Sequence, residues 1–267
     1  NAADYGMPQR RRRVFILGYL EGTELHSELT SCESPIQWMT SEGVFARAFP
    51  VESTSRVLAP QFSVNGDLVE ITNTFNLDGK GSPFAEAGCL VGRDVATARL
   101  APRYDGPFTA LGDVLVEEEA VPEEFFINGE LGEWSYLKGP KALERVSRST
   151  GHVYRYSEGG IAFPDPLDRP SRTIITGEGG KSPSRFKHVV RTPSGRFRRL
   201  VPVELERLNM FPDDHTIGVP DSRRAFLMGN ALVTGIVAQV SRSLVARLGL
   251  DGTAEAIEER PTLVWGT

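Results

Sequence analysis

The sequence has 267 residues, 40% of them hydrophobic and 24% charged, which suffices for a packed core and is ordinary for a soluble protein. It contains no run of about 18 apolar residues and no signal-peptide pattern, so we expect no membrane partner. Cys32 and Cys89 form no disulfide framework and the four histidines form no zinc pattern, so we expect a reducing cytoplasm and no metal site.

The net charge of −5 weighs weakly against a nucleic-acid partner, but the charge is unevenly distributed. Nine acidic residues and no Lys or Arg lie between Asp105 and Glu133. Between Arg169 and Arg199 there are nine basic residues and one acidic residue, Glu178. Because phosphates act over only about a Debye length, roughly 8–10 Å, this basic stripe can bind nucleic acid locally. A solvated surface run is the alternative interpretation.

The N-terminal segment 9–20, QRRRRVFILGYL, places four arginines directly before an apolar stretch typical of a strand. Successive side chains of a strand alternate in direction, so we expect Arg11 and Arg13 on one face. Arg10 and Arg12 would then point to the other face.

The middle of the chain is organised by turns rather than by long periodic helices. Residues 21–60 are irregular and indicate a linker followed by the start of a new domain. Residues 61–165 consist of short segments separated by Asn-Gly, Asp-Gly and Gly-Gly pairs. We expect one helix here, around Lys141 to Ser147. The Gly79–Ser82 loop is either a second DNA-facing loop or an ordinary exposed turn.

Two strands around a glycine-rich turn are expected next, at residues 172–176 and 186–190. A helix should follow at Pro202, which suits a first helical turn, with the acid Glu204 near the positive helix end. Apolar residues then recur at helical spacing, which predicts one long amphipathic helix from Arg223 to Leu248.

Three segments resemble, in order, signature motifs of the bacterial DNA cytosine-5 methyltransferases. The first, residues 1–15 with Gln9-Arg10-Arg11-Arg12-Arg13, resembles the eighth motif, whose core is Gln-Arg-x-Arg. The segment from Arg198 to Pro212 resembles the ninth motif, and Gly229–Val233 resembles the tenth. Arg172-Thr173-Ile174 resembles the Thr-Leu or Thr-Ile pair with which the family contacts DNA.

This resemblance implies an α/β fold: the C-terminal part of a Rossmann-like S-adenosylmethionine-dependent methyltransferase domain, plus a smaller β-rich target-recognition domain. Residues 1–25 would end the catalytic domain, 26–199 would form the target-recognition domain, and 200–267 would return to the catalytic domain. Target choice would then reside between about residues 26 and 197.

The family's Phe-x-Gly-x-Gly cofactor loop and Pro-Cys nucleophile do not occur in this sequence. We interpret Cys32 and Cys89 as ordinary thiols, neither of them the nucleophile. Because Asn1 rather than Met stands first, we expect a piece of a single-chain enzyme, with one subunit of a split enzyme as the alternative. Either way, we expect the isolated chain to be inactive.

In the family, a cysteine thiolate adds to C6 of a cytosine flipped out of the duplex, and C5 receives the methyl group. Charge develops on the ring during that addition, and a guanidinium stabilises it. By resemblance, Arg13 would contact the O2 edge of the base, with Arg11 beside it and Gln9 orienting both. For Arg10 and Arg12 we expect phosphate contact or solvation.

The resemblance assigns further residues to DNA and to the cofactor. Thr173 would pack on the DNA backbone, whereas Ile174 is expected in the core. The basic residues that flank the glycine-rich turn, of which about half would contact phosphate, are Arg172, Lys181, Arg185 and Lys187. Asn230 and Ala231 would form an edge of the S-adenosylmethionine site, with a helix cap as the alternative for Asn230.

Three residues depart from the family pattern. Val201 and Val203 replace the usual polar Thr and Arg of the ninth motif, and Ala231 stands where many members have Ser. These side chains cannot make the polar contacts of the residues they replace.

The expected partners are double-stranded DNA, an N-terminal catalytic half and a cognate restriction endonuclease. A non-catalytic DNA-binding protein that kept only target recognition is the rival hypothesis. Such a protein would need neither a base-contacting arginine nor a cofactor edge, so the presence of Arg13 and Asn230 counts against it.

Overall fold

The structure is a computed structural model that describes residues 1–54, 61–77, 84–129 and 131–250. The Gly79–Ser82 loop therefore lies outside the described residues. The described residues combine helices with short strands, as an α/β protein does. No described helix is both long and apolar enough to cross a bilayer.

The chain divides into two compact units. Among the described residues, the first comprises Asn1–Arg13 and Pro107–Gly235, and the second comprises Val14–Gly106 and residues 236–250. The boundaries expected at residues 25/26 and 199/200 do not coincide with this division, because the buried core of the first unit spans residue 199. That core consists of Leu111, Val114, Ile174, Val190, Leu200, Leu205, Leu208, Ala225 and Met228.

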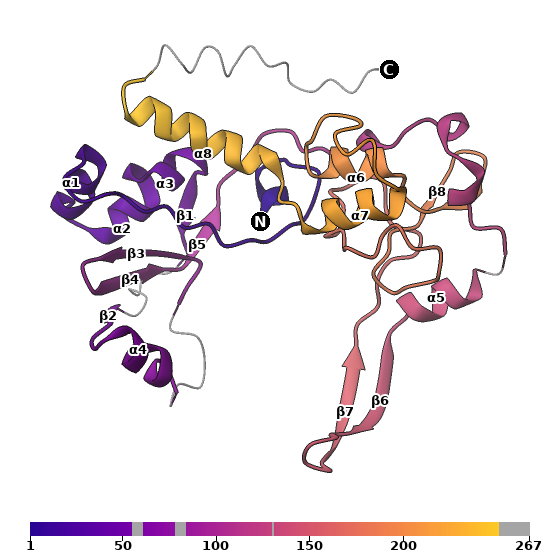
Figure 1. The fold of residues 1–267 in the computed structure, drawn as a ribbon, viewed down its shortest axis with the longest axis horizontal. Helices are drawn as coiled ribbons and strands as arrows, with labels where there is room; N and C mark the ends of the chain where they lie inside the picture. Colours follow the sequence, from indigo (N-terminus) through magenta and orange to yellow (C-terminus); the bar gives the residue numbers. More distant parts are fainter. Residues whose placement is uncertain (55–60, 78–83, 130, 251–267) are drawn as a thin grey trace. The chain divides into compact units, whose positions relative to one another are not determined.

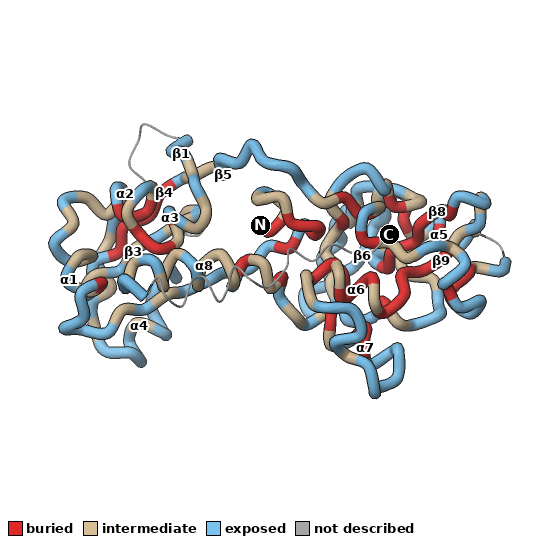
Figure 2. Tube along the Cα trace, turned by 90° about the horizontal axis from the view of Figure 1, so that it is seen from above, coloured by how far each residue is buried: buried red, intermediate tan, exposed pale blue. Residues whose placement is uncertain are grey.

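The first unit is built from short elements around helix α6, where Figure 2 shows many of its buried stretches. Its elements are η1 (Ala2–Tyr5), η3 (Gly112–Val114), η4 (Glu118–Ala120), η5 (Glu123–Phe125), α5 (Gly132–Lys138), β6 (Lys141–Val146), β7 (Val153–Glu158), β8 (Val190–Arg191), β9 (Phe197–Arg198), α6 (Pro202–Leu208) and α7 (Asp221–Asn230). Its strands form two antiparallel pairs, β6–β7 and β8–β9. An isolated parallel bridge joins Gln9 to Ser171.

The second unit packs helices against small antiparallel sheets. Its elements are α1 (Glu24–Ser31), α2 (Pro35–Gln37), η2 (Trp38–Glu42), α3 (Val44–Ala48), β1 (Val51–Ser53), β2 (Gln61–Ser63), α4 (Leu68–Thr74), β3 (Ala87–Val91), β4 (Asp94–Ala98), β5 (Leu100–Pro102) and most of α8 (Thr234–Arg247). The strand orders are β2-β4-β3 and β1-β5. Within this unit, Arg247 of α8 lies over the Trp38 ring and pairs with Glu28.

The prediction of a helix around Lys141 to Ser147 is wrong, because Lys141–Val146 form strand β6 and Ser147 belongs to no helix. β6 pairs in register with β7, from Lys141 opposite Glu158 to Val146 opposite Val153 (Figure 1). β7 has the sequence VYRYSE, whose valine and tyrosines favour a strand. The local sequence of residues 141–146 is ambiguous, and pairing with β7 determines their conformation.

The two strands expected at residues 172–176 and 186–190 do not form as predicted. Only Val190 belongs to a strand, the two-residue β8. Backbone amides that a sheet would use are bound instead by buried side chains: Ile174 N donates to Gln9 Oε1 at 3.0 Å, and His188 N donates to Glu178 Oε2 at 3.0 Å. These side chains take the place of a neighbouring strand.

Helix α6 begins at Pro202 as predicted, and Glu204 Oε2 accepts a hydrogen bond from Val201 N at 2.8 Å. The prediction of a single long helix from Arg223 to Leu248 is wrong, because α7 ends at Asn230 and α8 begins at Thr234. Asn209 bridges the break: its Nδ2 donates to Met228 O at 2.9 Å, and its carbonyl accepts from Thr234 N at 2.9 Å.

Residues 14–20 carry the apolar pattern of a strand but belong to no described strand. Val14 is 87% exposed and Ile16 is 91% exposed. The sequence pattern identifies an apolar segment correctly, but these residues have no strand partner among those described.

Candidate functional site

An open cleft of about 480 Å³ in the first unit brings together residues of the N-terminal segment and of the segment near Thr173. We call it the arginine cleft; it is lined by Asn1, Arg10, Arg12, Arg13, Arg172 and Thr173. Backbone hydrogen bonds join its two segments, from Arg10 N to Ser171 O at 2.8 Å and from Ser171 N to Pro8 O at 2.8 Å. Four arginines on one concave surface favour an anionic ligand such as phosphate.

Arg11 and Arg13 do not share a face, contrary to the strand-based expectation. Arg13 is exposed in the arginine cleft, whereas Arg11 is 2% exposed and points into the protein. Arg11 donates to Ile174 O at 3.2 Å and to Gly229 O at 2.7 Å. Residues 10–13 belong to no sheet, so strict strand alternation does not apply to them.

Burial and the positive charge of Arg13 lower the pKa of Arg11 to about 10. Arg11 is therefore charged at neutral pH, and its hydrogen bonds hold the eighth motif against the tenth. It is a positioning residue, because its guanidinium is directed away from the cleft.

Gln9 is fully buried and connects four partners. Its Oε1 accepts hydrogen bonds from Ile174 N at 3.0 Å and from Arg11 at 3.3 Å. Its Nε2 donates to Leu208 O at 3.2 Å and to Asn209 Oδ1 at 3.1 Å. Gln9 thus fixes Arg11 and the backbone after Thr173 relative to α6.

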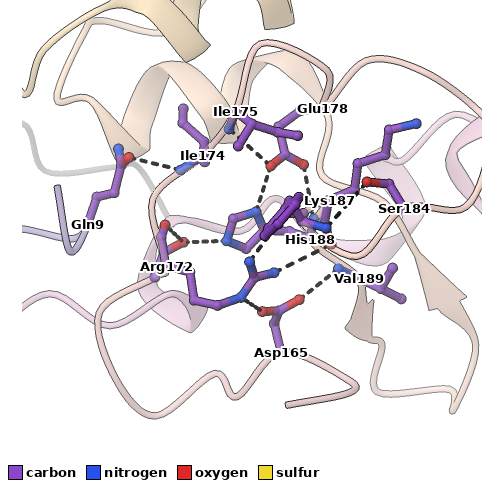
Figure 3. A network of polar contacts seen from close by, with 12 residues as sticks. Gln9, Asp165, Arg172, Ile174, Ile175, Glu178, Ser184, Lys187, His188 and Val189 are labelled. Atoms are coloured by element: carbon purple, nitrogen blue, oxygen red, sulfur yellow. Dashed lines mark hydrogen bonds and ion pairs between the residues drawn. The ribbon is translucent and has the colours of Figure 1, made fainter. Parts of the chain in front are cut away.

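Arg172 is held from beneath by a buried ionic network (Figure 3). Its Nε donates to Asp165 Oδ1 at 2.7 Å, and its NH1 donates to Phe186 O at 3.2 Å. Burial by itself would raise the pKa of Asp165, but the hydrogen bond from Arg172 and nearby positive charge bring that pKa below its usual value. Arg172 therefore reaches the cleft with its orientation fixed.

Glu178, His188 and Ser171 form a second buried chain. His188 Nδ1 lies 2.9 Å from Glu178 Oε1, and His188 Nε2 lies 3.0 Å from Ser171 Oγ. These residue types also make hydrolytic triads. Here, however, Ser171 is 2% exposed and its hydroxyl donates to Arg172 O at 2.8 Å, so it cannot act as a nucleophile. The chain stiffens the backbone behind the cleft.

Two of the basic residues expected at DNA phosphates are engaged inside the protein. Lys187 is buried and its ammonium donates to Gly180 O at 2.8 Å and to Ser182 O at 2.6 Å. Arg185 donates to Leu137 O at 3.0 Å and pairs with Glu158 at 3.2 Å. Their donors already have protein acceptors and neither residue lines the arginine cleft, so we do not propose Lys187 or Arg185 as phosphate contacts. The donors of Arg172 are engaged as well, but Arg172 lines the cleft.

Lys181 differs from these two residues. Its side chain is 74% exposed, and among the described residues it forms an ion pair with Glu124 at 3.1 Å. Surface pairs of this kind are weak and exchange readily with other anions. Thr173 lines the cleft and donates its hydroxyl to Arg10 O, while Ile174 is buried in the core.

Asn230 is the last residue of α7. Its side chain is exposed, and its Nδ2 donates to Phe226 O at 3.0 Å. Ala231 follows as the C-terminal cap residue, and its N donates to Leu227 O at 2.9 Å. Both residues lie in the first unit, as the arginine cleft does.

Cys32 and Cys89 are free, half-buried thiols of the second unit, and neither lines the arginine cleft. Burial and the proximity of Cys32 raise the pKa of Cys89, which disfavours its thiolate. Cys32 Sγ donates to Ser34 O at 3.2 Å. Neither thiol has the environment of an activated nucleophile.

Sequence reasoning did not identify Asp165, Lys138 or His188 as buried supports of the cleft. One signal was available: Glu178 is the only acid in the basic stripe, and a lone acid among cations indicates an internal partner. No local pattern pointed to Lys138, whose ammonium is buried against Lys187 O at 2.6 Å.

Residues 1–246 match the family described as C-5 cytosine-specific DNA methylase, and the chain belongs to that family, with its α/β methyltransferase fold class. More particularly, it is similar to the type II methyltransferase M.Sau3AI of Staphylococcus aureus. The identity is 36% over 247 residues, which cover 91% of this chain and 57% of the relative. The chain thus spans a little over half the length of the curated relative that it matches.

Two solved structures show a more distant likeness. The Entamoeba histolytica methyltransferase EhMeth superposes with a TM-score of 0.37 and 13% identity, over 61% of this chain and 53% of that one. The S. pombe Dnmt2 methyltransferase superposes with a TM-score of 0.38 and 12% identity, over 58% and 51% of the two chains. The family assignment rests on the sequence matches and not on these superpositions.

Proposed function

We propose that this chain is the C-terminal part of an enzyme that transfers a methyl group from S-adenosylmethionine to C5 of cytosine in a specific DNA site. The observation that carries the proposal is the arginine cleft. In it, Arg13 of the eighth-motif segment and Thr173 of the DNA-contacting pair meet from distant parts of the sequence. An N-terminal half would supply the nucleophilic cysteine.

The cleft suits a flipped cytosine and the phosphates that flank it. Arg13 is exposed and lines the cleft. Its NH1 donates to Arg12 O at 2.7 Å, and its remaining donors can act on a pyrimidine ring that gains negative charge. Arg10 and Arg12 would contact phosphates, and Arg172 adds a cation whose position Asp165 fixes. Thr173 would pack on the sugar-phosphate backbone beside the vacated base position.

Asn230 and Ala231 fit one edge of a cofactor site. The exposed Asn230 donates its Nδ2 to Phe226 O, which leaves its side-chain oxygen as an acceptor. The partly exposed Leu232 adds apolar surface next to it. S-adenosylmethionine would supply the methyl group, and these residues would help to hold it.

The proposed partners follow from the same assignment. Duplex DNA is the substrate, and a cognate restriction endonuclease fits the similarity to a type II methyltransferase. The exposed apolar segment with Val14, Ile16 and Leu20 would pack against the N-terminal half. We propose the cytoplasm as the compartment, where the DNA substrate is found and thiols stay reduced.

Methyl transfer from labelled S-adenosylmethionine to duplex DNA tests the proposal. We expect no transfer by this chain alone, and transfer when it is combined with its N-terminal half. Transfer by the chain alone would show that the nucleophile had been wrongly assigned to the other half. DNA binding by the combined halves without any transfer would instead favour the non-catalytic DNA-binding protein.

A further inference from the structure

The β6–β7 hairpin of the first unit stands away from the body of that unit (Figure 1). Beyond Lys141 and Glu158 at its root, every residue of the two strands except Tyr156 is exposed. The exposed residues include Val146 at 62% and Val153 at 56%. A two-stranded ribbon is marginally stable in water, and exposed apolar residues on it indicate a surface that binds a partner.

The root of the hairpin is held firmly. The NH1 group of Arg185 donates to Leu137 O at 3.0 Å and to Gly139 O at 3.1 Å, and it lies 3.2 Å from Glu158 Oε2. Lys141 also donates to Leu137 O, at 3.1 Å. Arg185, which the sequence had suggested as a phosphate contact, is therefore a positioning residue that fixes the direction of the ribbon.

The same root is connected to the arginine cleft. Lys138 ends α5 directly before the hairpin, and its ammonium donates to Lys187 O at 2.6 Å and lies 3.5 Å from Asp165 Oδ2. The other carboxylate oxygen of Asp165 binds Arg172, which lines the cleft. The ribbon and the cleft are thus two ends of one buried network within one unit, so a ligand in the cleft meets a ribbon of defined orientation.

The register places different side chains on the two faces of the ribbon. Directly opposed residues share a face, so Leu143, Arg145, Tyr154 and Tyr156 lie on one side. The guanidinium of Arg145 lies 3.6 Å from the centroid of the Tyr156 ring, which holds its planar fork.

The opposite face carries Arg155 beside Glu144, and the turn beyond the strands adds Arg148. Glu158 is engaged by Arg185 at the root, so the outer part of the ribbon has three arginines and one acid. This excess of positive charge complements a polyanion rather than a neutral or basic surface. Strands about 4.8 Å apart also fit a major groove about 12 Å wide.

We infer that the β6–β7 ribbon enters the major groove of duplex DNA, with Arg145 as a residue that recognises a base edge. This inference rests on the proposed function, because it takes the DNA substrate of the cleft as the ligand of the ribbon. Arg155, on the opposite face, contacts phosphate or solvent and carries no sequence information.

The test measures DNA selection without chemistry. The chain combined with its N-terminal half selects duplexes from a random pool, and competition binding then compares the selected site with its single-base variants. Arg145→Ala should lower the preference for the selected base at one position by about 10- to 100-fold, as expected for loss of one bidentate contact. Arg145→Lys should lose the same preference, because an ammonium has no planar fork.

Arg155→Ala is the matched control, since it removes the same side chain from the other face of the same ribbon. It should leave the preference for each base unchanged and at most flatten the salt dependence of binding by about one unit. Unchanged thermal unfolding checks that all three variants are folded, as expected for exposed positions.

If both Arg145 variants keep the wild-type preference at every position, the ribbon does not recognise bases and the inference is wrong. That result leaves the proposed function intact as long as the wild-type protein selects and methylates a site. Failure of the wild-type protein to bind any duplex is a different outcome, which overturns the proposed function and the inference together.

Discussion

Arg13 and Arg11 lie two residues apart and have opposite environments. Arg13 is exposed in the arginine cleft, whereas Arg11 is buried and donates to Ile174 O and Gly229 O. A cation that lines the cleft can contact a bound base, whereas the buried Arg11 stabilises the fold through its hydrogen bonds. The two residues therefore give distinguishable variants.

We expect Arg13→Ala in the combined enzyme to lower kcat by roughly 100- to 1000-fold, equivalent to about 2.7–4 kcal/mol, with a much smaller loss of DNA affinity. The reason is that the proposed contact with the base would strengthen as charge develops on the ring. Single-turnover methylation and equilibrium binding measure the two effects. Arg11→Ala should instead lower the free energy of unfolding. Equal losses of binding and turnover in Arg13→Ala would identify Arg13 as a phosphate contact.

Asp165 is the carboxylate that orients Arg172, and its lowered pKa links the cleft to the pH dependence of stability. A folded-state pKa below the unfolded value means that the ionised group stabilises the protein above about pH 4. This contribution is lost as the pH falls through the folded-state pKa.

Asp165→Asn should therefore lower the free energy of unfolding at pH 7 by about 3–5 kcal/mol, since Arg172 and Lys138 lose their buried partner. The difference from wild type should shrink as the pH falls below about 4. Urea unfolding at several pH values measures this. Asp168→Asn, at an exposed pair with Arg169, is the control and should change little. A difference that stays constant down to the lowest pH would contradict the account.

At the scale of elements, α7 is placed by close backbone contact rather than by side-chain packing alone. A Cβ on Gly229 would lie 2.3 Å from Thr176 N and 2.5 Å from Ile175 C, which are backbone atoms that cannot move aside. Gly229 O also accepts the hydrogen bond of Arg11. The glycine of the tenth motif therefore sets the distance between α7 and the segment that carries Thr173.

Gly229→Ala should destabilise the protein by about 1–3 kcal/mol, because an added methyl group forces the two segments apart. Gly132→Ala is the control, since nothing lies within 4 Å of its Cβ position and it begins helix α5. Thermal unfolding of both variants decides the matter. Equal midpoints would mean that the backbone contact at Gly229 contributes nothing.

At the scale of the molecule, the core of the first unit crosses the boundary expected at residue 199. Ile174 and Val190 lie in one buried cluster with Leu205, Leu208 and Met228. A chimera that takes only residues 26–197 from a relative with another target site joins two unrelated halves of this core. We expect it to unfold several degrees below its parents. Exchange of 107–235 together with residues 1–13, whose Gln9 and Arg11 bond to Ile174, should restore the midpoint. A 26–197 chimera as stable as both parents would show that the two halves pack independently.

Family membership and the start of α6 could both be inferred from local sequence. Motifs in a fixed order identify a family whatever surrounds them, and Pro202 with Glu204 favours a helix start through local contacts alone. The apolar segment at 14–20 was also recognisable, because its composition is a local property.

Which arginine faces the cleft and which is buried depends on contacts between segments that are distant in the sequence. Arg10 and Thr173 meet across 163 residues of sequence, and no local pattern encodes such a contact. For the same reason, the strands expected near Ile174 and His188 were replaced by hydrogen bonds to Gln9 and Glu178. A backbone amide accepts whichever buried partner the fold presents, and that partner comes from elsewhere in the chain.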